Sequence, residues 1–369
     1  MTRMPLPLSL FLVFVVALAP LVAGCGDPVR QALDEVGYHV EDLTAGDGDT
    51  AGPGDYLTVT ATVWLLADGA QGRQLDRTDG DGVGFVLGAG EAMPGWDAGL
   101  VGMRVGGTRR LLLAPAMIDD AHRPLGADPA DELWCEITLV DVARVAVVDH
   151  ETGAGDPAAA GDYVRITYQG WRLEDGRRGE PIASSDGDAP VGVMLGARMV
   201  NRGLELGLVG MRPGGVREVT VPPALAYGRQ GRDQVPPDAT LVYEVRLVER
   251  PRIAHEIVRE GTGDPVGPGQ RVRFHLDGWI AGPGGAKGEQ FQDTRRLRMP
   301  ADVILGSFKI QPGLELGIRG MKPGEIRRLH VPATMAFGSR GWFRGDRVVV
   351  APDTDVIYEV ELMGGGVRP

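Results

Sequence analysis

The sequence has few of the residues that most enzyme chemistries require. Only two cysteines and six histidines occur among its 369 residues. The histidines are scattered, and no spacing would place two of them on one helix face, so we expect no metal site. No glycine-rich loop ends in Lys-Ser or Lys-Thr, which argues against a phosphate-binding loop. We therefore expect a function that needs neither a metal ion nor another cofactor.

Basic charge is also scarce, because the formal net charge is −12. Nucleic-acid binding depends on a basic face that displaces counterions, so no nucleic-acid partner is expected. One acidic cluster could hold a calcium ion or form a solvated loop, and the second is favoured. The cluster consists of Asp119, Asp120, Asp128, Asp131 and Glu132.

Long apolar runs are confined to the N-terminus. Arg3 is soon followed by LPLSLFLVFVVALAP, which is short for a membrane span, and then by LVAGC, which ends at Cys25. This pattern resembles a bacterial lipoprotein signal, in which residues 1–24 are removed and Cys25 is lipidated. The alternative is an ordinary secretion signal or anchor with an incidental cysteine. We expect an exported protein that a lipid tethers to a membrane, facing the periplasm or the cell surface.

Only Cys135 then remains, so no intrachain disulfide is expected. It lies within ELWCEITLV. A lone cysteine in such an apolar run is more typical of a buried strand than of a nucleophile.

The rest of the chain is a threefold repeat. The segment GLELGLVGMRPGGVREV begins at Gly203, and its counterparts begin at Gly95 and Gly313. The copies are roughly 110 residues apart, a period that is too long for a solenoid and matches a small domain. The repeated opening phrases divide the chain into a linker, three domains and a tail. The linker is 25–36, the three domains are 37–143, 144–250 and 251–364, and the tail is 365–369.

The repeated segment also predicts its own local structure. Leu204, Leu208 and Met211 share one face of a helix of about two turns, which the following glycines end. The run VREVTV after them indicates a strand covered on one face. Each unit is therefore expected to be α+β, with a short helix lying on a sheet.

Motifs in the second domain resemble those of the FKBP-type peptidyl-prolyl isomerases. They are VRITYQGWRLEDG, VMLG, AYG and VPPDATLVYEVRL, in the family's order and spacing. The third domain follows with AFG and APDTDVIYEVEL, whereas the first keeps FVLG and lacks AYG. The resemblance implies three tandem domains, each a strongly curved antiparallel sheet of five or six strands around a short helix. An apolar pocket would lie between helix and sheet.

The resemblance implies a catalytic pocket in the second domain, where Tyr227 would donate to the substrate carbonyl. Ala183 stands at the family's usual pocket aspartate, Asn201 at a usual aliphatic residue, and Leu204 at a common tryptophan. These departures imply activity that is reduced or altered in substrate preference. The pocket residues would be Tyr168, Ile182, Val193, Val200, Leu204, Tyr227, Val235 and Tyr243.

The resemblance gives the third domain a partial, substrate-binding pocket, in which Leu276 and Phe337 stand where hydroxyls belong. Trp342 and Phe343 lie on a loop that overhangs the pocket in the family, so they would either contact client chains or cap the domain's own core. The residues assigned to this pocket are Phe291, Val303, Ile310, Leu314, Phe337, Val350, Tyr358, Trp342 and Phe343.

The first domain is expected to be an inactive spacer or binding module. It has Ala61 at the position of the first pocket tyrosine, and Ile118–Asp120 in place of AYG. The pocket residues that it retains are Leu75, Asp76, Phe85 and Trp96.

Isomerising an X-Pro bond requires no acid–base pair, because the barrier of about 18–20 kcal/mol is the loss of amide resonance. Aromatic and aliphatic pocket residues are the expected signature. We predict an isomerase or folding chaperone for exported proline-containing polypeptides. The alternative is a non-catalytic, lipid-tethered scaffold that holds peptides in degenerate pockets.

Overall fold

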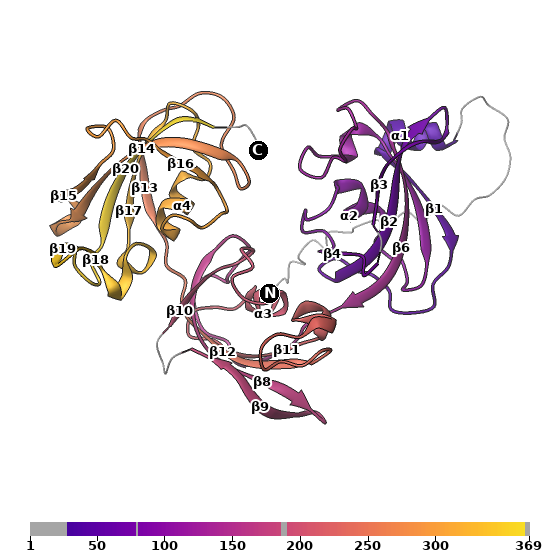
Figure 1. Cartoon of the computed structure of the whole chain (residues 1–369), viewed down its shortest axis with the longest axis horizontal. Helices are drawn as coiled ribbons and strands as arrows, with labels where there is room; N and C mark the ends of the chain where they lie inside the picture. The colour runs from indigo at the N-terminus through magenta and orange to yellow at the C-terminus, as the bar shows by residue number, and fades with distance from the viewer. Residues whose placement is uncertain (1–27, 79, 186–189, 366–369) are drawn as a thin grey trace, which may run out of the picture. The chain divides into compact units, whose positions relative to one another are not determined.

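The computed structural model describes residues 28–78, 80–185 and 190–365 of the chain. It contains three antiparallel sheets of six strands each, and each sheet carries one short helix (Figure 1). The prediction of three tandem α+β domains is confirmed. The signal segment 1–24 and Cys25 lie outside the described residues, as do residues 366–369 of the tail. None of the helices in the described ranges is both long and apolar enough to cross a membrane.

The first domain is preceded by helix α1, Pro28–Val36, in a segment predicted as a linker. Leu33 is buried, and Arg30 pairs with Glu132 at 2.8 Å, so this part of the segment packs on the domain. The strand order is β1-β5-β6-β2-β3, with β4 paired to β2. The elements are β1 (Tyr38–Thr44), β2 (Tyr56–Ala67), β3 (Ala70–Arg77), β4 (Val83–Val86), α2 (Pro94–Gly99), β5 (Thr108–Leu113) and β6 (Leu133–Ala143).

The second domain repeats this arrangement. Its strand order is β10-β8-β12-β11-β7, with β9 paired to β8. The elements are β7 (Ala146–Glu151), β8 (Tyr163–Glu174), β9 (Arg177–Ser184), β10 (Val191–Met194), α3 (Arg202–Leu208), β11 (Val216–Val221) and β12 (Leu241–Glu249).

The third domain has the same six-stranded sheet and, in addition, a separate hairpin. Its strand order is β13-β17-β20-β14-β15, with β16 paired to β14, while β18 and β19 form a separate two-stranded sheet. The elements are β13 (Ala254–Arg259), β14 (Arg271–Ala281), β15 (Lys287–Asp293), β16 (Ala301–Ile304), α4 (Pro312–Ile318), β17 (Ile326–Val331), β18 (Trp342–Arg344), β19 (Arg347–Val350) and β20 (Val356–Gly365).

Alternation along the strands builds the core of each domain. In β2, every second residue from Leu57 to Val63 is buried, as expected for a sheet covered on one face. The predicted helix face is confirmed, since Leu204, Leu208 and Met211 are all buried. In each domain the helix lies over one strand (β5, β11 or β17), and the strand that pairs with it is β6, β12 or β20. One inward-facing position on that pairing strand is equivalent in the three domains. Cys135, Tyr243 and Tyr358 occupy it, opposite Leu111, Val219 and Leu329.

Each helix lies directly on its sheet because two of its glycines face the strand beneath. A Cβ at Gly203 of α3 would lie 2.2 Å from Val221 Cγ1, and one at Gly207 would lie 2.4 Å from Val219 Cγ1. The corresponding glycines of α2 and α4 approach β5 and β17 just as closely. Any side chain at these positions would push the helix off the sheet.

We predict that Gly317→Ala destabilises the third domain by about 1–3 kcal/mol, because the new methyl would overpack the core. Its Cβ would lie 2.2 Å from Leu329 Cδ1. The matched control is Gly267→Ala in the same domain, where a Cβ meets nothing within 4 Å. Native-state hydrogen exchange of β17 and β20 measures both, and equal exchange in the two variants would contradict the prediction.

Candidate functional site

The site in the second domain is built around two tyrosines on neighbouring strands. The rings of Tyr168 on β8 and Tyr243 on β12 meet edge to face, with centroids 6.3 Å apart. Gly170 is paired with Tyr243 across the two strands, and a Cβ there would lie 2.5 Å from Tyr243 Cε1. The glycine of the TYQG motif thus makes room for the ring that the VYEV motif supplies.

Tyr227 completes a group of three tyrosines. It follows the short turn Pro223–Leu225 and is half-buried, and its hydroxyl lies close enough to that of Tyr243 to affect its pKa. Burial raises the pKa of Tyr243 well above its usual range, and the adjacent hydroxyls of Tyr227 and Tyr168 add to this effect. Tyr243 therefore stays protonated at physiological pH and can serve as a neutral hydrogen-bonding group.

The other residues assigned to this pocket surround the tyrosines to different depths. Val193, Leu204 and Val235 are buried, whereas Ile182 and Val200 are half-buried. Ile182 lies beside Gly170, with its Cγ1 3.5 Å from where a Cβ would be. The structure brings Ile182 and the three tyrosines together. Their assignment as catalytic residues stays a prediction.

Asn201 is part of this group, although its sequence position suggested only a departure from the family pattern. Its Oδ1 accepts a hydrogen bond from Leu204 N at 2.9 Å, and its Nδ2 donates to Tyr243 Oη at 2.8 Å. The first bond caps α3, a role that asparagine before a short helix often has. The second could not be found from sequence, because it depends on where α3 places its cap relative to β12.

Ala183 leaves one side of the site without a carboxylate. It is exposed on β9 and lines a cavity of about 280 Å³ at the β8–β9 edge. The cavity is also lined by Gln169, Trp171 and Pro181. The residues that line this cavity in the described part of the chain carry no charge.

In the third domain, aromatic rings fill the corresponding space. Phe291 makes edge-to-face contacts with Phe337, Trp342 and Tyr358 at centroid distances of 5.9–6.0 Å. Trp342 stacks on Phe337, with centroids 5.5 Å apart and ring planes 8° apart. The hairpin residue Trp342 thus covers the domain's own aromatic cluster, while Phe343 beside it is 47% exposed. The structure favours core capping for Trp342 and leaves Phe343 free for outside contact.

All other residues assigned to this pocket belong to the same cluster. Leu314, Val350 and Tyr358 are buried, and the remaining members are packed against them. The hydroxyl of Tyr358 has no hydrogen-bond partner among the described residues, and burial raises its pKa. The half-buried members are Phe291, Val303, Ile310, Phe337 and Trp342.

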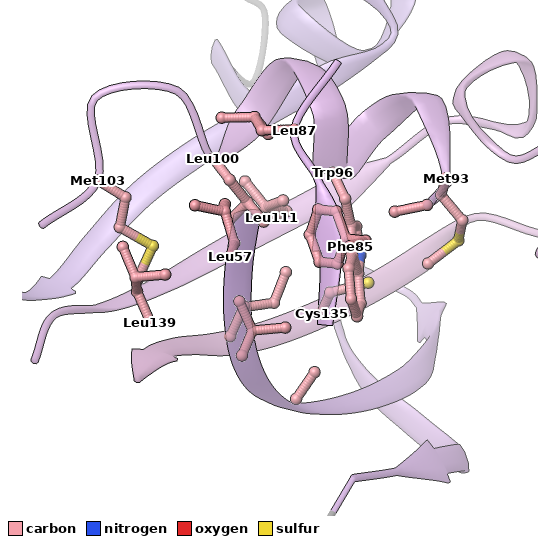
Figure 2. Close-up of a cluster of buried hydrophobic side chains, with 14 of the residues drawn as sticks. Leu57, Phe85, Leu87, Met93, Trp96, Leu100, Met103, Leu111, Cys135 and Leu139 are labelled. Atoms are coloured by element: carbon pink, nitrogen blue, oxygen red, sulfur yellow. The ribbon is translucent and has the colours of Figure 1, made fainter. Parts of the chain in front are cut away.

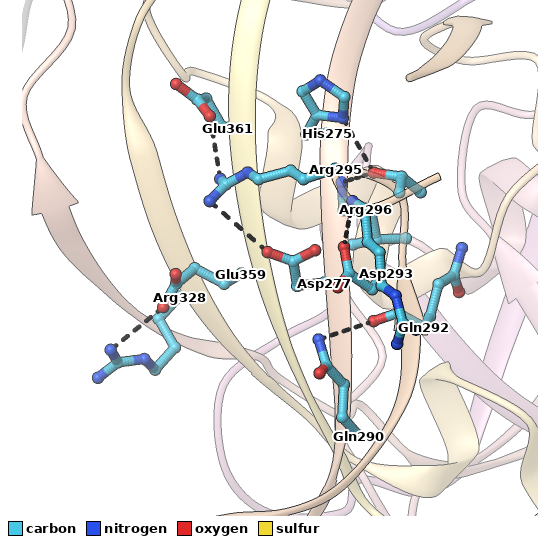
Figure 3. Close-up of polar contacts among 12 residues, drawn as sticks. His275, Asp277, Gln290, Gln292, Asp293, Arg295, Arg296, Arg328, Glu359 and Glu361 are labelled. Atoms are coloured by element: carbon cyan, nitrogen blue, oxygen red, sulfur yellow. Dashed lines mark hydrogen bonds and ion pairs between the residues drawn. The ribbon is translucent and has the colours of Figure 1, made fainter. Parts of the chain in front are cut away.

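Charged groups of the third domain lie on the opposite face of its sheet (Figure 3). Arg295 is 3.6 Å from Asp277 and 3.0 Å from Glu361, which alternate along β14 and β20 with inward residues such as Leu276. Burial raises the pKa of Asp277, and Arg295 opposes that shift. This network supports the outer surface of the domain, on the side of the sheet away from the aromatic cluster.

The first domain has no hydroxyl at the positions of the tyrosines. Ala61 is buried at the position of Tyr168, Asp119 stands at the position of Tyr227, and the rings of Phe85 and Trp96 lie with centroids 6.0 Å apart beside Cys135 (Figure 2). Burial raises the pKa of Cys135 to about 12, and contact with Trp96 offsets only part of this shift. The prediction of a buried strand cysteine is confirmed, and its thiol is inert because the reactive thiolate is suppressed.

The other two residues assigned to the pocket of the first domain, Leu75 and Asp76, lie toward the surface. Leu75 is half-buried against the hydrophobic core of the domain, and Asp76 is exposed with its Oδ1 accepting from Arg77 N.

The acidic loop of this domain is paired within the protein, since Asp119 binds His122 at 2.8 Å and Asp131 accepts from Asp128 N. Over the described part of the chain, no three His, Cys, Asp or Glu side chains are grouped to hold a metal ion.

Comparison with known proteins gives one family for all three domains. The model described as FKBP-type peptidyl-prolyl cis-trans isomerase matches residues 48–139, 155–248 and 263–363. Human peptidyl-prolyl cis-trans isomerase FKBP10 is 30% identical over 280 residues, which are 72% of this chain and 46% of that protein. Mouse peptidyl-prolyl cis-trans isomerase FKBP9 is 28% identical over 270 residues, 69% of this chain and 46% of that protein.

The chain spans about half the length of these curated relatives. Among solved structures, the three FKBP domains of wheat FKBP73 are 22% identical to it. That match covers 60% of this chain and 94% of the wheat chain, with a TM-score of 0.29.

We predict that Trp342→Ala lowers the free energy of unfolding of the third domain by about 2–3 kcal/mol, because two ring contacts and part of the apolar cover are lost. Phe343→Ala, its neighbour on the same strand, is expected to change it by about 0.5 kcal/mol or less, as for a surface residue. Pulse proteolysis in urea, read by mass spectrometry of third-domain fragments, measures both. Similar losses in the two variants would mean that Trp342 is not a core cap.

Proposed function

Because this chain belongs to the FKBP-type peptidyl-prolyl cis-trans isomerase family, we propose that it isomerises X-Pro bonds of exported polypeptides, mainly through its second domain. The observation that supports this choice is the group of three tyrosines, in which Tyr168 packs edge to face on Tyr243 and Tyr227 lies beside them. Neither Phe337 of the third domain nor Asp119 of the first, which stand at the position of Tyr227, offers such a hydroxyl.

The chemistry fits a site without a titrating pair. The planar amide is the more dipolar state and the twisted amide the less dipolar one, so a dry, apolar site favours the twisted form. Leu204 and Val235 would provide the apolar surface for the proline ring, and Tyr227 would hold the preceding carbonyl. Each tenfold gain in rate needs about 1.4 kcal/mol of preference for the twisted form.

The first and third domains would act differently in this proposal. The described interiors of both are occupied by their own side chains, namely Phe85 and Trp96 in one and Trp342 over Phe337 in the other. They would hold client chains or space the catalytic domain. The same observation supports the second candidate function, in which the whole protein is a non-catalytic scaffold that binds peptides.

We further propose that the protein acts at a membrane surface outside the cytoplasm. The apolar segment before Cys25 and the small-residue box around it support removal of residues 1–24 and lipidation of this cysteine. A lipid tether would keep the domains near polypeptides that emerge from export, which are the proposed clients.

For catalysis, we predict that Tyr227→Phe lowers kcat/KM for X-Pro peptides about 2- to 12-fold, the value of one hydrogen bond of about 0.5–1.5 kcal/mol. Val235→Ala is expected to lower it as well, because apolar contact with the proline ring is lost. The measurement is a protease-coupled assay of the full chain and its variants over varied X residues. If the wild-type chain does not exceed the uncatalysed rate, the scaffold function is the correct one.

For localisation, we predict that Cys25→Ser abolishes lipid attachment and releases the protein from the membrane fraction. The measurement is fractionation of expressing bacteria combined with mass spectrometry of the N-terminal peptide. Cys135→Ser is the matched control, since this buried thiol should have no part in anchoring. A Cys25→Ser protein that stays membrane-bound without lipid would instead indicate an uncleaved anchor.

A further inference from the structure

Two side chains of the second domain take part in the hydrophobic core of the third. Tyr163 on β8 and Met194 on β10 are 9% and 1% exposed, and they belong to a cluster whose other buried members, among the described residues, lie in the third domain. The Tyr163 hydroxyl donates to the backbone carbonyl of Thr334 at 3.2 Å. Ala197, which follows β10, packs against the same cluster. The two domains are therefore joined by an apolar contact as well as by the chain.

The segment between β12 and β13 is short and is held by ion pairs. Within it, Arg250 lies 2.6 Å from Asp162, and Arg252 lies 2.6 Å from Asp156. Both acids precede β8, and Asp162 is the direct neighbour of Tyr163. The linker thus holds the same end of the second domain that contacts the third, and the two domains form one compact unit.

This contact lies at the start of a loop that carries part of the candidate site. Residues 195–201 connect β10 to α3, and this loop includes Val200 and ends at the helix cap Asn201. Leu195 N donates to Asp162 O at 2.9 Å, which ties the start of the loop to the strand end beside the third domain. Because the loop is short, support at its start also limits the movement of the pocket wall at its end.

We propose that the third domain supports the candidate site of the second domain, with Tyr163 and Met194 as positioning residues that hold the β10–α3 loop. Neither residue touches the substrate, because the third domain covers both. The inference rests on the proposed isomerase function. It gives the third domain a role that needs no peptide in its own filled interior.

The equivalent positions of the third domain show that the fold does not require this burial. Tyr163 and Met194 are paired across β8 and β10, and their counterparts, Arg271 and Ile304, are paired across β14 and β16. Both counterparts are exposed. The burial of Tyr163 and Met194 is therefore due to the contact with the third domain.

The deciding variant unfolds the third domain without a change in the second. Gly317→Leu places a bulky side chain where a Cβ alone would lie 2.2 Å from Leu329 Cδ1. Gly99→Leu is the matched control, because the equivalent Cβ in the first domain would lie 2.6 Å from Leu111 Cδ2. The first domain belongs to a separate compact unit, so its unfolding removes no support from the second. Both variants are made in the full chain.

The readouts are kcat and KM for X-Pro peptides and the hydrogen exchange of the loop amides. We expect Gly317→Leu to raise KM about fivefold with kcat little changed, since a loosened pocket wall weakens ground-state and transition-state binding alike. The amides of Leu195 and Ala197, which are hydrogen-bonded in the loop, should exchange faster. Gly99→Leu should change neither quantity.

A second pair of variants separates the two domains while both stay folded. Ala197→Arg places a charged side chain in the apolar contact, and Ala89→Arg makes the same change at the equivalent, exposed position of the first domain. Ala197→Arg should raise KM and increase the radius of gyration in small-angle scattering, whereas Ala89→Arg should do neither. Tyr163→Phe keeps the ring and loses only the bond to Thr334, so it should raise KM less than Ala197→Arg does.

The possible failures can be told apart. If Tyr227→Phe has no effect on activity, the proposed function falls, and the loop exchange of Gly317→Leu then decides by itself whether the third domain supports the loop. If KM and loop exchange are the same in Gly317→Leu and Gly99→Leu, this inference is overturned. A lower kcat with unchanged KM in Gly317→Leu would also overturn it, because the third domain would then carry the activity itself.

Discussion

The contact between each short helix and its sheet is the constraint on which the rest of the structure depends. Glycines at Gly203 and Gly207 bring the backbone of α3 onto β11, at a distance where no Cβ fits. Because the helix is so close, its N-terminal cap lies beside the inner face of the next strand. Asn201 can therefore reach Tyr243 with a side chain of only two torsions. The hydrogen bond between Asn201 and Tyr243 is therefore a consequence of backbone packing.

The three domains share this scaffold and differ in what the sheet presents beneath the helix. The equivalent inward position is a thiol at Cys135, a phenol at Tyr243 that accepts from Asn201, and a phenol at Tyr358 that has no partner in the described ranges. An unpaired buried hydroxyl is costly, by about 1–3 kcal/mol. The third domain offsets that cost with ring contacts around Phe291. Divergence within one chain has thus changed the interior and left the framework intact.

Sequence reasoning predicted the framework because its signals are local. Leu204, Leu208 and Met211 fall on one helix face, and the family resemblance of its motifs assigned Tyr168, Tyr227 and Tyr243 to one pocket. Most of the details that it missed depend on contacts between distant segments. Helix α1 packs on the first domain through Leu33, although its segment was predicted as a linker; Val29, Leu33 and Val36 fall at i, i+4 and i+7, a helix-face spacing that could have found it. The stacking of Trp342 on Phe337 and the bond from Asn201 are instead set by three-dimensional placement.

In the proposed function, the filled interior of the third domain would weaken its binding of proline. A ring that enters between Phe291 and Phe337 must first displace Trp342, which contacts both. Each aromatic pair contributes about 0.5–1.5 kcal/mol, so displacement costs about 1–3 kcal/mol. That cost weakens binding about 5- to 150-fold relative to an open site with the same lining. No such indole covers the tyrosines of the second domain in the described residues, where Arg232 lies over the Tyr227 ring at 5.7 Å. A client peptide would therefore engage the second domain first, even if the three domains met it equally often.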